Sequence, residues 1–355
     1  MLRFTRYCQI FIFFFIIQES FSQNLLNPND LNKIQNQINY SDTSNIRRFN
    51  KQKNRFVEFY KNRKINNKIP NLLNLYNNFH KKIKSYNDES LQSINWTELG
   101  PKKINSNEPN AGNGRINCIA FNPLKPNQIW VGAASGGLWK SENNGNNWEV
   151  IDMIQFMSIG ISDIKFSKSN PNIVYVATGD ANGGLFSGTY SIGILKSTDN
   201  GNNWQATNFF SLEQGILIYE LLVHPENENQ VWAATNKGIL YTENGGDNWN
   251  YLIENQIFTT IKMHTQNAEI LFSTTFDWNG NTAVLRSNDS GKNWSEILKF
   301  DSINRIKIEI DAKYPNNLLL LGSSVDKSDM GVCLKSYDLG NNWTDITNSL
   351  NDAVY

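Results

Sequence analysis

From residue 95 onward the chain consists of short runs in which apolar and polar residues alternate, a pattern that predicts β-strands. The first four runs predict strands at 116–121, 129–134, 137–141 and 148–152. The same order recurs four more times. We expect the first strand of each later group at 161–166, 219–223, 259–263 and 306–310. We expect the second strand of each at 173–177, 230–234, 269–274 and 317–322.

A short polar motif separates the third and fourth strands of every group. Its pattern is Ser-x-Asp-x-Gly-x-x-Trp, with Thr or Asn replacing Ser or Asp in some copies, and we call it the box turn. Its four defining positions are occupied by Ser141, Asn143, Gly145, Trp148, Ser197, Asp199, Gly201, Trp204, Thr242, Asn244, Gly246, Trp249, Ser287, Asp289, Gly291, Trp294, Ser336, Asp338, Gly340 and Trp343. The tryptophans are 56, 45, 45 and 49 residues apart, a period typical of repeated four-stranded blades.

The residue types of the box turn suit a hairpin connection. Asp or Asn bonds the backbone two residues on, Gly accepts a positive φ, and Ser or Thr caps the turn. We expect the Trp to open the next strand, to bury its indole against the neighbouring blade and to find a partner for its N–H. The motif indicates scaffold rather than an active site. We therefore predict an all-β fold, a β-propeller with five complete four-stranded blades.

The N-terminal part has a different pattern. A basic helix is predicted at 45–64, and apolar residues recur at helical spacing from Leu72 to Tyr86. This Asn-rich segment, 23–94, is predicted to be a helical leader and linker in front of the repeats at 95–355.

Residues 1–22 have the features of a secretory signal peptide. Arg3 and Arg6 precede an unbroken apolar run at 10–17, and small residues follow at 20–22. Eight apolar residues are too few to cross a bilayer, so we expect no transmembrane span. The mature protein is expected outside the cytoplasm, either secreted or at the cell surface.

Charge is distributed unevenly along a chain whose net charge is zero. Residues 1–95 contain 15 lysines and arginines against 6 acidic residues, which leaves 18 against 27 for 96–355, so the two parts carry +9 and −9. A basic segment of this kind usually indicates nucleic acid as a partner. No base-stacking module accompanies it, so we expect no nucleic-acid partner and favour a solvated helical face. A third interpretation of the charge is that the basic segment docks onto the acidic repeats.

The segment 95–99 matches 342–346 almost residue for residue and predicts one more outer strand. Its companion strands would have to follow Tyr355, because the fifth group already supplies its own outer strand. We therefore expect the chain to be part of a larger propeller, truncated at its C-terminus, and we expect it to be monomeric.

The box motifs, with segments such as GRINCIAFNPLKPNQIWVGAASGGLWKSENNGNNW, resemble those of secreted Bacteroidetes-type Asp-box propellers, also called bacterial neuraminidase repeat propellers. These are grouped with the sortilin N-terminal domain and the xyloglucanase-like propellers. The resemblance covers 95–355 and implies the architecture more specifically than any activity.

The resemblance also implies what an enzyme of this group would carry. A sialidase would show three arginines gripping a carboxylate, but the repeats hold only Arg115, Arg286 and Arg305, and Arg286 lies beside a box turn. A xyloglucanase-type hydrolase would use two aspartates, and the resemblance places one of them at Ala134. We therefore expect neither activity from these residues.

A ligand is expected on the face opposite the box turns, where longer loops join the second strand to the third. Candidate residues there are Asp180, Tyr190, Asp277 and Trp278, since carboxylates beside aromatic rings suit a sugar or a peptide. Two functions follow. The first is a non-catalytic scaffold that binds carbohydrate or protein. The alternative is a glycoside hydrolase using Asp180 and Asp277, whose carboxyl groups would lie about 5 to 10 Å apart.

Cofactor and metal chemistry have little support in the sequence. Cys118 and Cys333 are expected as separate buried thiols, and His80, His224 and His264 are isolated from other ligand types. No cofactor and no metal ion are expected.

Overall fold

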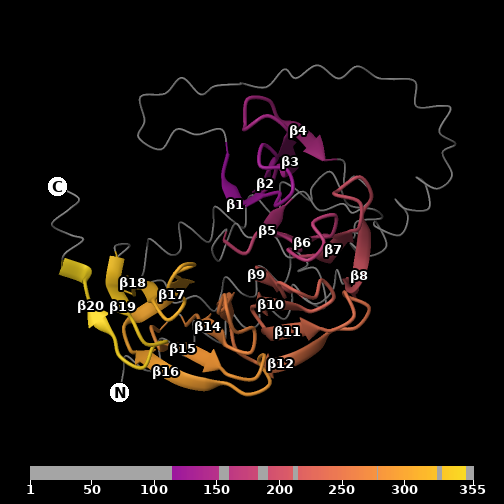
Figure 1. The fold of residues 1–355 in the computed structure, drawn as a ribbon. Helices are drawn as coiled ribbons and strands as arrows, with labels where there is room; N and C mark the ends of the chain where they lie inside the picture. The colour runs from indigo at the N-terminus through magenta and orange to yellow at the C-terminus, as the bar shows by residue number, and fades with distance from the viewer. Residues whose placement is uncertain are drawn as a thin grey trace, which may run out of the picture. The chain divides into compact units, whose positions relative to one another are not determined.

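The computed structural model describes residues 114–151, 160–182, 191–210, 215–277, 279–325 and 330–348 of the 355-residue chain. Within these residues the chain forms twenty strands in five sheets (Figure 1). Apart from Gly215, these described residues belong to one compact unit. The predicted signal peptide, the leader and the strand at 95–99 lie outside the described residues.

Each sheet contains four consecutive strands. The first has β1 (Ile116–Phe121), β2 (Ile129–Ala133), β3 (Gly137–Ser141) and β4 (Glu149–Ile151). The second has β5 (Ile161–Phe166), β6 (Val174–Thr178), β7 (Gly193–Ser197) and β8 (Gln205–Phe210). The third has β9 (Ile218–Val223), β10 (Val231–Thr235), β11 (Gly238–Thr242) and β12 (Asn250–Glu254). The fourth has β13 (Phe258–Met263), β14 (Leu271–Thr275), β15 (Thr282–Ser287) and β16 (Ser295–Phe300). The fifth has β17 (Ile303–Ile310), β18 (Leu318–Ser324), β19 (Met330–Ser336) and β20 (Thr344–Asp345).

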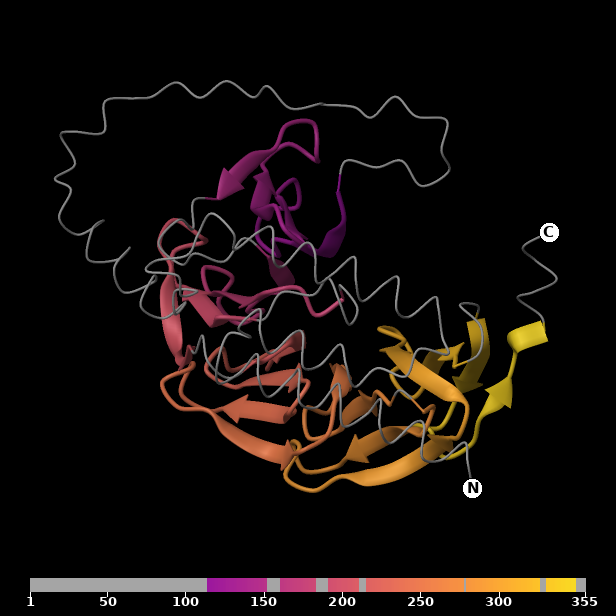
Figure 2. The same cartoon turned by 180° about the vertical axis from the view of Figure 1, so that it is seen from behind.

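All five sheets are antiparallel meanders in chain order, and the first strand of each packs beside the first strand of the next (Figures 1 and 2). This is the predicted propeller of four-stranded blades. The predicted bounds of β1 and β5 hold at both ends. Strand β17 begins three residues earlier than predicted, because it includes an irregular start between Ile303 and Arg305.

The box turns are closed by their own side chains, as the residue types predicted. Ser197 Oγ donates to Asp199 Oδ1 (2.8 Å) and accepts from the N–H of Gly201 (2.8 Å). Asp199 Oδ1 then accepts from the N–H of Asn203 (2.8 Å). The same contacts recur in the other four turns. Local side-chain hydrogen bonds therefore close each of the five turns.

The glycine of the box turn also makes room for the preceding blade. Gly201 has a φ of 84°, and a Cβ placed there would lie 2.3 Å from the ring of Trp130, which is fully buried on β2. Trp232 on β10 contacts the box turn of the next blade less closely: its Nε1 lies 3.4 Å from where a Cβ on Gly291 would be, and it donates to Ser290 O (3.2 Å). In both pairs an aromatic residue of one blade thus packs against the box turn of the next.

The box tryptophans follow the prediction only in part. Trp204 is buried with its ring 6.2 Å from that of Trp130, and Trp249 donates to Thr207 Oγ1 (3.3 Å) of the preceding blade. Trp148 in the first blade is exposed, and the indole N–H of Trp343 has no partner within the described residues. In every blade the strand begins one residue after the Trp, so this residue ends the turn instead of opening the strand.

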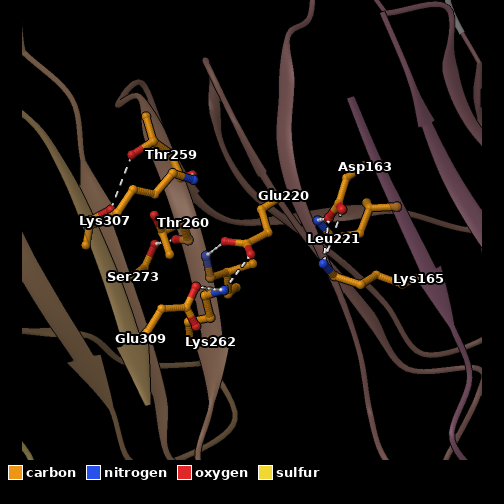
Figure 3. Close-up of polar contacts among 12 residues, drawn as sticks. Asp163, Lys165, Glu220, Leu221, Thr259, Thr260, Lys262, Ser273, Lys307 and Glu309 are labelled. Atoms are coloured by element: carbon orange, nitrogen blue, oxygen red, sulfur yellow. Dashed lines mark hydrogen bonds and ion pairs between the residues drawn. The ribbon is translucent and has the colours of Figure 1, made fainter. Parts of the chain in front are cut away.

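Acidic side chains on the first strands connect consecutive blades (Figure 3). Asp163 Oδ2 accepts from the backbone N–H of Leu221 on the next blade (2.7 Å). One blade further on, Glu220 Oε2 accepts from the N–H of Ile261 (3.0 Å). The first strand is an edge of its sheet, where backbone groups have no ladder partner. The carboxylates therefore satisfy edge amides of the neighbouring blade.

Lysines balance these carboxylates. Lys165 Nζ lies 3.0 Å from Asp163 Oδ2, and Lys262 Nζ lies 2.8 Å from Glu220 Oε1 and 2.6 Å from Glu309 Oε1. Burial acts to raise the pKa of Glu220, but the surrounding lysines, Lys262 first, outweigh it and lower that pKa below its ordinary value. In the fourth blade Thr260 takes the equivalent position, and its buried hydroxyl has no partner in the described structure.

Two glycines at the same position of the box turn allow the interblade contact to be measured. We expect Gly201→Ala to destabilise the protein by about 2–4 kcal/mol, the sum of positive-φ strain and overpacking against Trp130. Gly145 has nearly the same φ, 83°, but a Cβ there meets nothing nearer than 3.5 Å. Gly145→Ala should therefore cost about 1 kcal/mol. Urea unfolding measures both, and equal losses would contradict the packing role.

Glu220 and Glu309 bind the same lysine but differ in burial. Glu220→Ala should cost about 3 kcal/mol, because it leaves Lys262 without its buried partner and the Ile261 amide without an acceptor. The Glu309 side chain is 66% exposed, so Glu309→Ala should cost less than about 1 kcal/mol. Since folding lowers the pKa of Glu220, its contribution is present above the unfolded value of about 4.3 and is lost as pH falls below it. Unfolding curves between neutral pH and pH 3 should converge for wild type and Glu220→Ala, and parallel curves would count against this assignment.

Candidate functional site

The end of the blades opposite the box turns, which we call the loop face, is where each first strand begins. All five first strands carry a β-bulge there, and the additional residues are Asn117, Ser162, Tyr219, Thr259 and Asn304. A bulge changes the direction in which nearby side chains point and is common beside functional sites. The bulges are therefore the local feature that presents side chains to this face.

Asp180, in the loop after β6, is at the centre of a polar cluster on the loop face. Arg115, just before β1, forms an ion pair with Asp180 through Nη2 and Oδ2. The bulge residue Asn117 donates from Nδ2 to the other oxygen, Oδ1 (3.1 Å), which also accepts from the N–H of Asn182 (3.2 Å). The Asp180 side chain is only 3% exposed, so its carboxylate is held inside the cluster.

Asn182 brings a second arginine to the same place. Arg115 Nη1 donates to the Asn182 carbonyl (3.1 Å), and Arg305 Nη2 on β17 donates to Asn182 Oδ1. Burial lowers the pKa of Arg305 from its ordinary value. Residues of the first, second and fifth blades therefore meet at Asn182, and we call Arg115, Asp180, Asn182 and Arg305 the arginine cluster.

Asp277 is connected to the arginine cluster through the backbone. Its N–H donates to the Asn304 carbonyl (3.2 Å), and its neighbour Phe276 forms a β-bridge with Arg305. Asp277 Oδ1 accepts from the N–H of Asn279 (2.7 Å), and the residue is half-buried. The structure thus places both candidate aspartates on one face. The other two candidates, Tyr190 and Trp278, lie outside the described residues.

The remaining arginine and Ala134 lie where the sequence indicated. Arg286 donates to Leu339 O (3.0 Å) and Asn341 Oδ1 (3.1 Å) of a box turn, away from the arginine cluster. Ala134 is buried on the loop face, and its N–H donates to the Arg115 carbonyl (3.1 Å). Sequence reasoning did not select Asn117 and Asn182. In a chain so rich in asparagine, only their positions beside a bulge and a long loop set them apart.

The described residues contain no group of side chains suited to metal or thiol chemistry. No group of three or more His, Cys, Asp or Glu side chains is placed to hold a metal ion among these residues. Cys118 and Cys333 are free thiols, as expected, but only Cys333 is fully buried; Cys118 is partly buried, which raises its pKa to about 12. No described stretch forms a helix with the length and apolarity needed to cross a membrane.

In the arginine cluster, the N–H groups of Arg115 are more accessible to a ligand than the carboxylate of Asp180. The Arg115 side chain is 47% exposed, and a guanidinium presents several N–H groups in one plane. Both oxygens of Asp180 are already engaged by Arg115, Asn117 and Asn182. Such a surface suits hydroxyl-rich or carboxylate ligands.

Comparison with curated proteins finds two xyloglucanases. The chain is 29% identical over 137 residues to a probable oligoxyloglucan-reducing end-specific xyloglucanase of Neosartorya fischeri, covering 38% of this chain and 15% of that protein. It is 25% identical over 257 residues to the oligoxyloglucan-reducing end-specific xyloglucanase of Emericella nidulans, covering 70% of this chain and 29% of that protein. The chain therefore spans less than a third of either relative. No protein-family model matches it.

Solved structures with the same fold include GH74 enzymes. The GH74 enzyme from Niastella koreensis aligns with a TM-score of 0.51 at 15% identity, covering 65% of this chain and 38% of its own. An ancestral GH74 enzyme aligns with a TM-score of 0.51 at 24% identity, covering 65% and 32%. The GH74 xyloglucanase from Xanthomonas campestris aligns with a TM-score of 0.50 at 14% identity, covering 63% and 36%. These likenesses agree with the β-propeller fold.

The ion pair at the centre of the site is testable with a double-mutant cycle. We expect Arg115→Met and Asp180→Asn to show a coupling of about 1 kcal/mol, because one partner is buried and the other half exposed. The matched control is the pair Lys140–Glu142, 2.9 Å apart, in which Glu142 is exposed. Its coupling should stay below about 0.5 kcal/mol. Urea unfolding supplies all values, and equal couplings would contradict a structural role for the cluster.

Proposed function

We propose that this protein is a polysaccharide-directed β-propeller of the xyloglucanase type, which binds a β-glucan chain on its loop face and hydrolyses it. The observation that carries the proposal is the convergence of Arg115, Asp180 and Asp277 on that face. The similarity to two xyloglucanases supports the substrate class, and it favours hydrolysis over a purely structural scaffold.

In the proposed mechanism the two aspartates take different roles. Glycoside hydrolysis needs one carboxylic acid that protonates the leaving oxygen. It also needs one carboxylate that acts as a base on the attacking water, on the opposite side of the sugar. Asp180, paired with Arg115, is suited to act as the carboxylate. Asp277 is half-buried, and no lysine or arginine among the described residues is paired with it, so it is assigned the acid role. Arg115 and Arg305 would orient the sugar hydroxyls.

A second candidate function is binding of the same polysaccharide without turnover. Two observations favour it. Asp180 is 3% exposed with both oxygens engaged, and Ala134 occupies the position where the family resemblance places a carboxylate. The two candidates share the ligand and the face, and they differ only in whether a glycosidic bond is cleaved. Export of the protein, which the segment 1–22 predicts, is part of both proposals.

A hydrolysis assay on xyloglucan oligosaccharides separates the two functions. Asp277→Asn should lower kcat about 100-fold or more if Asp277 is the acid, while binding measured by calorimetry persists. The matched control is Asp199→Asn, because this residue lies in a box turn at the opposite end and other blades carry Asn there. Binding by the wild type without any turnover would replace hydrolysis with the second candidate. Absence of both would refute the polysaccharide proposal.

A further inference from the structure

Blade five exposes two tyrosines at its box-turn end, away from the loop face. Tyr314 lies in the turn between β17 and β18, and Tyr337 lies in the box turn between β19 and β20. Their exposed fractions are 56% and 61%. Both line one hollow of about 560 Å³, together with Gln266 from the turn between β13 and β14 of blade four. The hollow therefore combines two aromatic rings with a side-chain amide.

The fold brings the two tyrosines together through a contact that every blade makes. In blade five the N–H of Leu339 donates to the Asn316 carbonyl (2.9 Å), which joins the box turn to the turn after the first strand. Equivalent bonds occur in the other four blades. Two residues on these neighbouring turns are thus held side by side in each blade, whatever their side chains.

Only blade five places aromatic residues at these two positions among the described blades. The carbonyl of Tyr314 accepts from the N–H of Asn317 (2.8 Å), and the residues making that same turn contact elsewhere are Lys125, Asn170, Asn227 and Asn267. The residues equivalent to Tyr337, second in the box pattern, are Glu142, Thr198, Glu243 and Asn288. Four polar versions form the same turns, so the turn geometry does not require tyrosine.

The tyrosines are not explained by packing either. Each ring is more than half exposed even though a lysine Nζ lies over it, Lys313 at 5.0 Å from Tyr314 and Lys335 at 4.7 Å from Tyr337. Exposed aromatic rings bury little apolar area and contribute little to stability by that route. Paired exposed aromatics in a concave site are instead typical of ligand contact.

The chemistry of the hollow fits a neutral sugar chain. A pyranose ring has an apolar C–H face that stacks on an aromatic ring, and its hydroxyls pair with amides such as Gln266 and Asn317. Lys313 and Lys335 are matched by two carboxylates: Asp311, which accepts from the N–H groups of Lys313 (2.8 Å) and Tyr314 (3.1 Å), and Asp338, which follows Tyr337 in the box turn. An anionic ligand would call for an excess of cations, which this surface lacks within the described residues.

We propose that Tyr314 and Tyr337 form a second polysaccharide-binding site, on the box-turn end of blade five. This site goes beyond the proposed function, because it needs binding without hydrolysis and lies at the opposite end of the blades from Asp180 and Asp277. It would hold a neutral glucan chain on the protein independently of the loop face.

Tyrosine nitration tests the site directly on the full chain. Tetranitromethane should modify Tyr314 and Tyr337, and xyloglucan should protect both, as measured by peptide mass spectrometry. Protection should persist in Asp277→Asn, so loss of hydrolysis and loss of this site are distinguishable. No protection by xyloglucan would overturn the proposal, as would protection by a protein extract but not by the polysaccharide.

Substitution gives an independent readout. Tyr314→Ala with Tyr337→Ala should weaken retention on a xyloglucan affinity gel about tenfold, whereas the double Phe variant should keep it, because stacking needs the ring. The matched control changes the equivalent residues of blade one, Lys125→Ala with Glu142→Ala, and should leave retention unchanged. Unfolding curves verify that each variant is folded. Equal retention of the wild type and the folded double Ala variant would refute the site.

Discussion

Close approach between the second strand of one blade and the box turn of the next is the contact on which this structure depends. A Cβ on Gly201 would lie 2.3 Å from the ring of Trp130, whereas at Gly291 the nearest atom is Cδ1 of Leu252, at 3.0 Å, with Trp232 Nε1 at 3.4 Å. The box turn is first a locally hydrogen-bonded hairpin and then a seat for a neighbour. At Gly201 one residue satisfies both requirements, whereas Gly145 satisfies only the first, because its positive φ suits the turn and a Cβ there would meet nothing nearer than 3.5 Å.

A second set of contacts holds the first strands together. Backbone amides on the edge of each sheet would be unsatisfied, and Asp163 and Glu220 accept from them across the blade boundary. Lysines pair with these carboxylates and offset the free-energy cost of burying their charge. Because these carboxylate contacts fix the first strands, they also fix the bulged starts of those strands, which present the arginine cluster. The first strands therefore carry both the carboxylate contacts between blades and the bulges at the loop face.

The residues proposed to contact ligands occur where one blade departs from the repeat. The loop after β6 carries Asp180 and Asn182, whereas the corresponding connection in blade three is a tight turn from Thr235 to Gly238. Blade five carries Tyr314 and Tyr337 at positions that are polar in the other described blades. Repetition provides the scaffold, and the deviations supply the groups from which ligand contact is proposed.

The sequence by itself determined the architecture. Alternating runs and the box pattern are local signals, since each turn closes with its own side chains. The five meanders, and most strand bounds to within one residue, could therefore be predicted from spacing alone. It also placed Asp180 and Asp277 on the loop face, because antiparallel strands alternate their ends. Only the tertiary structure decided that Asp180 is locked by Arg115 and Asn117, that Arg305 arrives from a strand 123 residues beyond Asn182, and that Trp148 stays exposed. Those outcomes depend on side chains that occur in single blades, so their contacts do not recur with the period of the repeat.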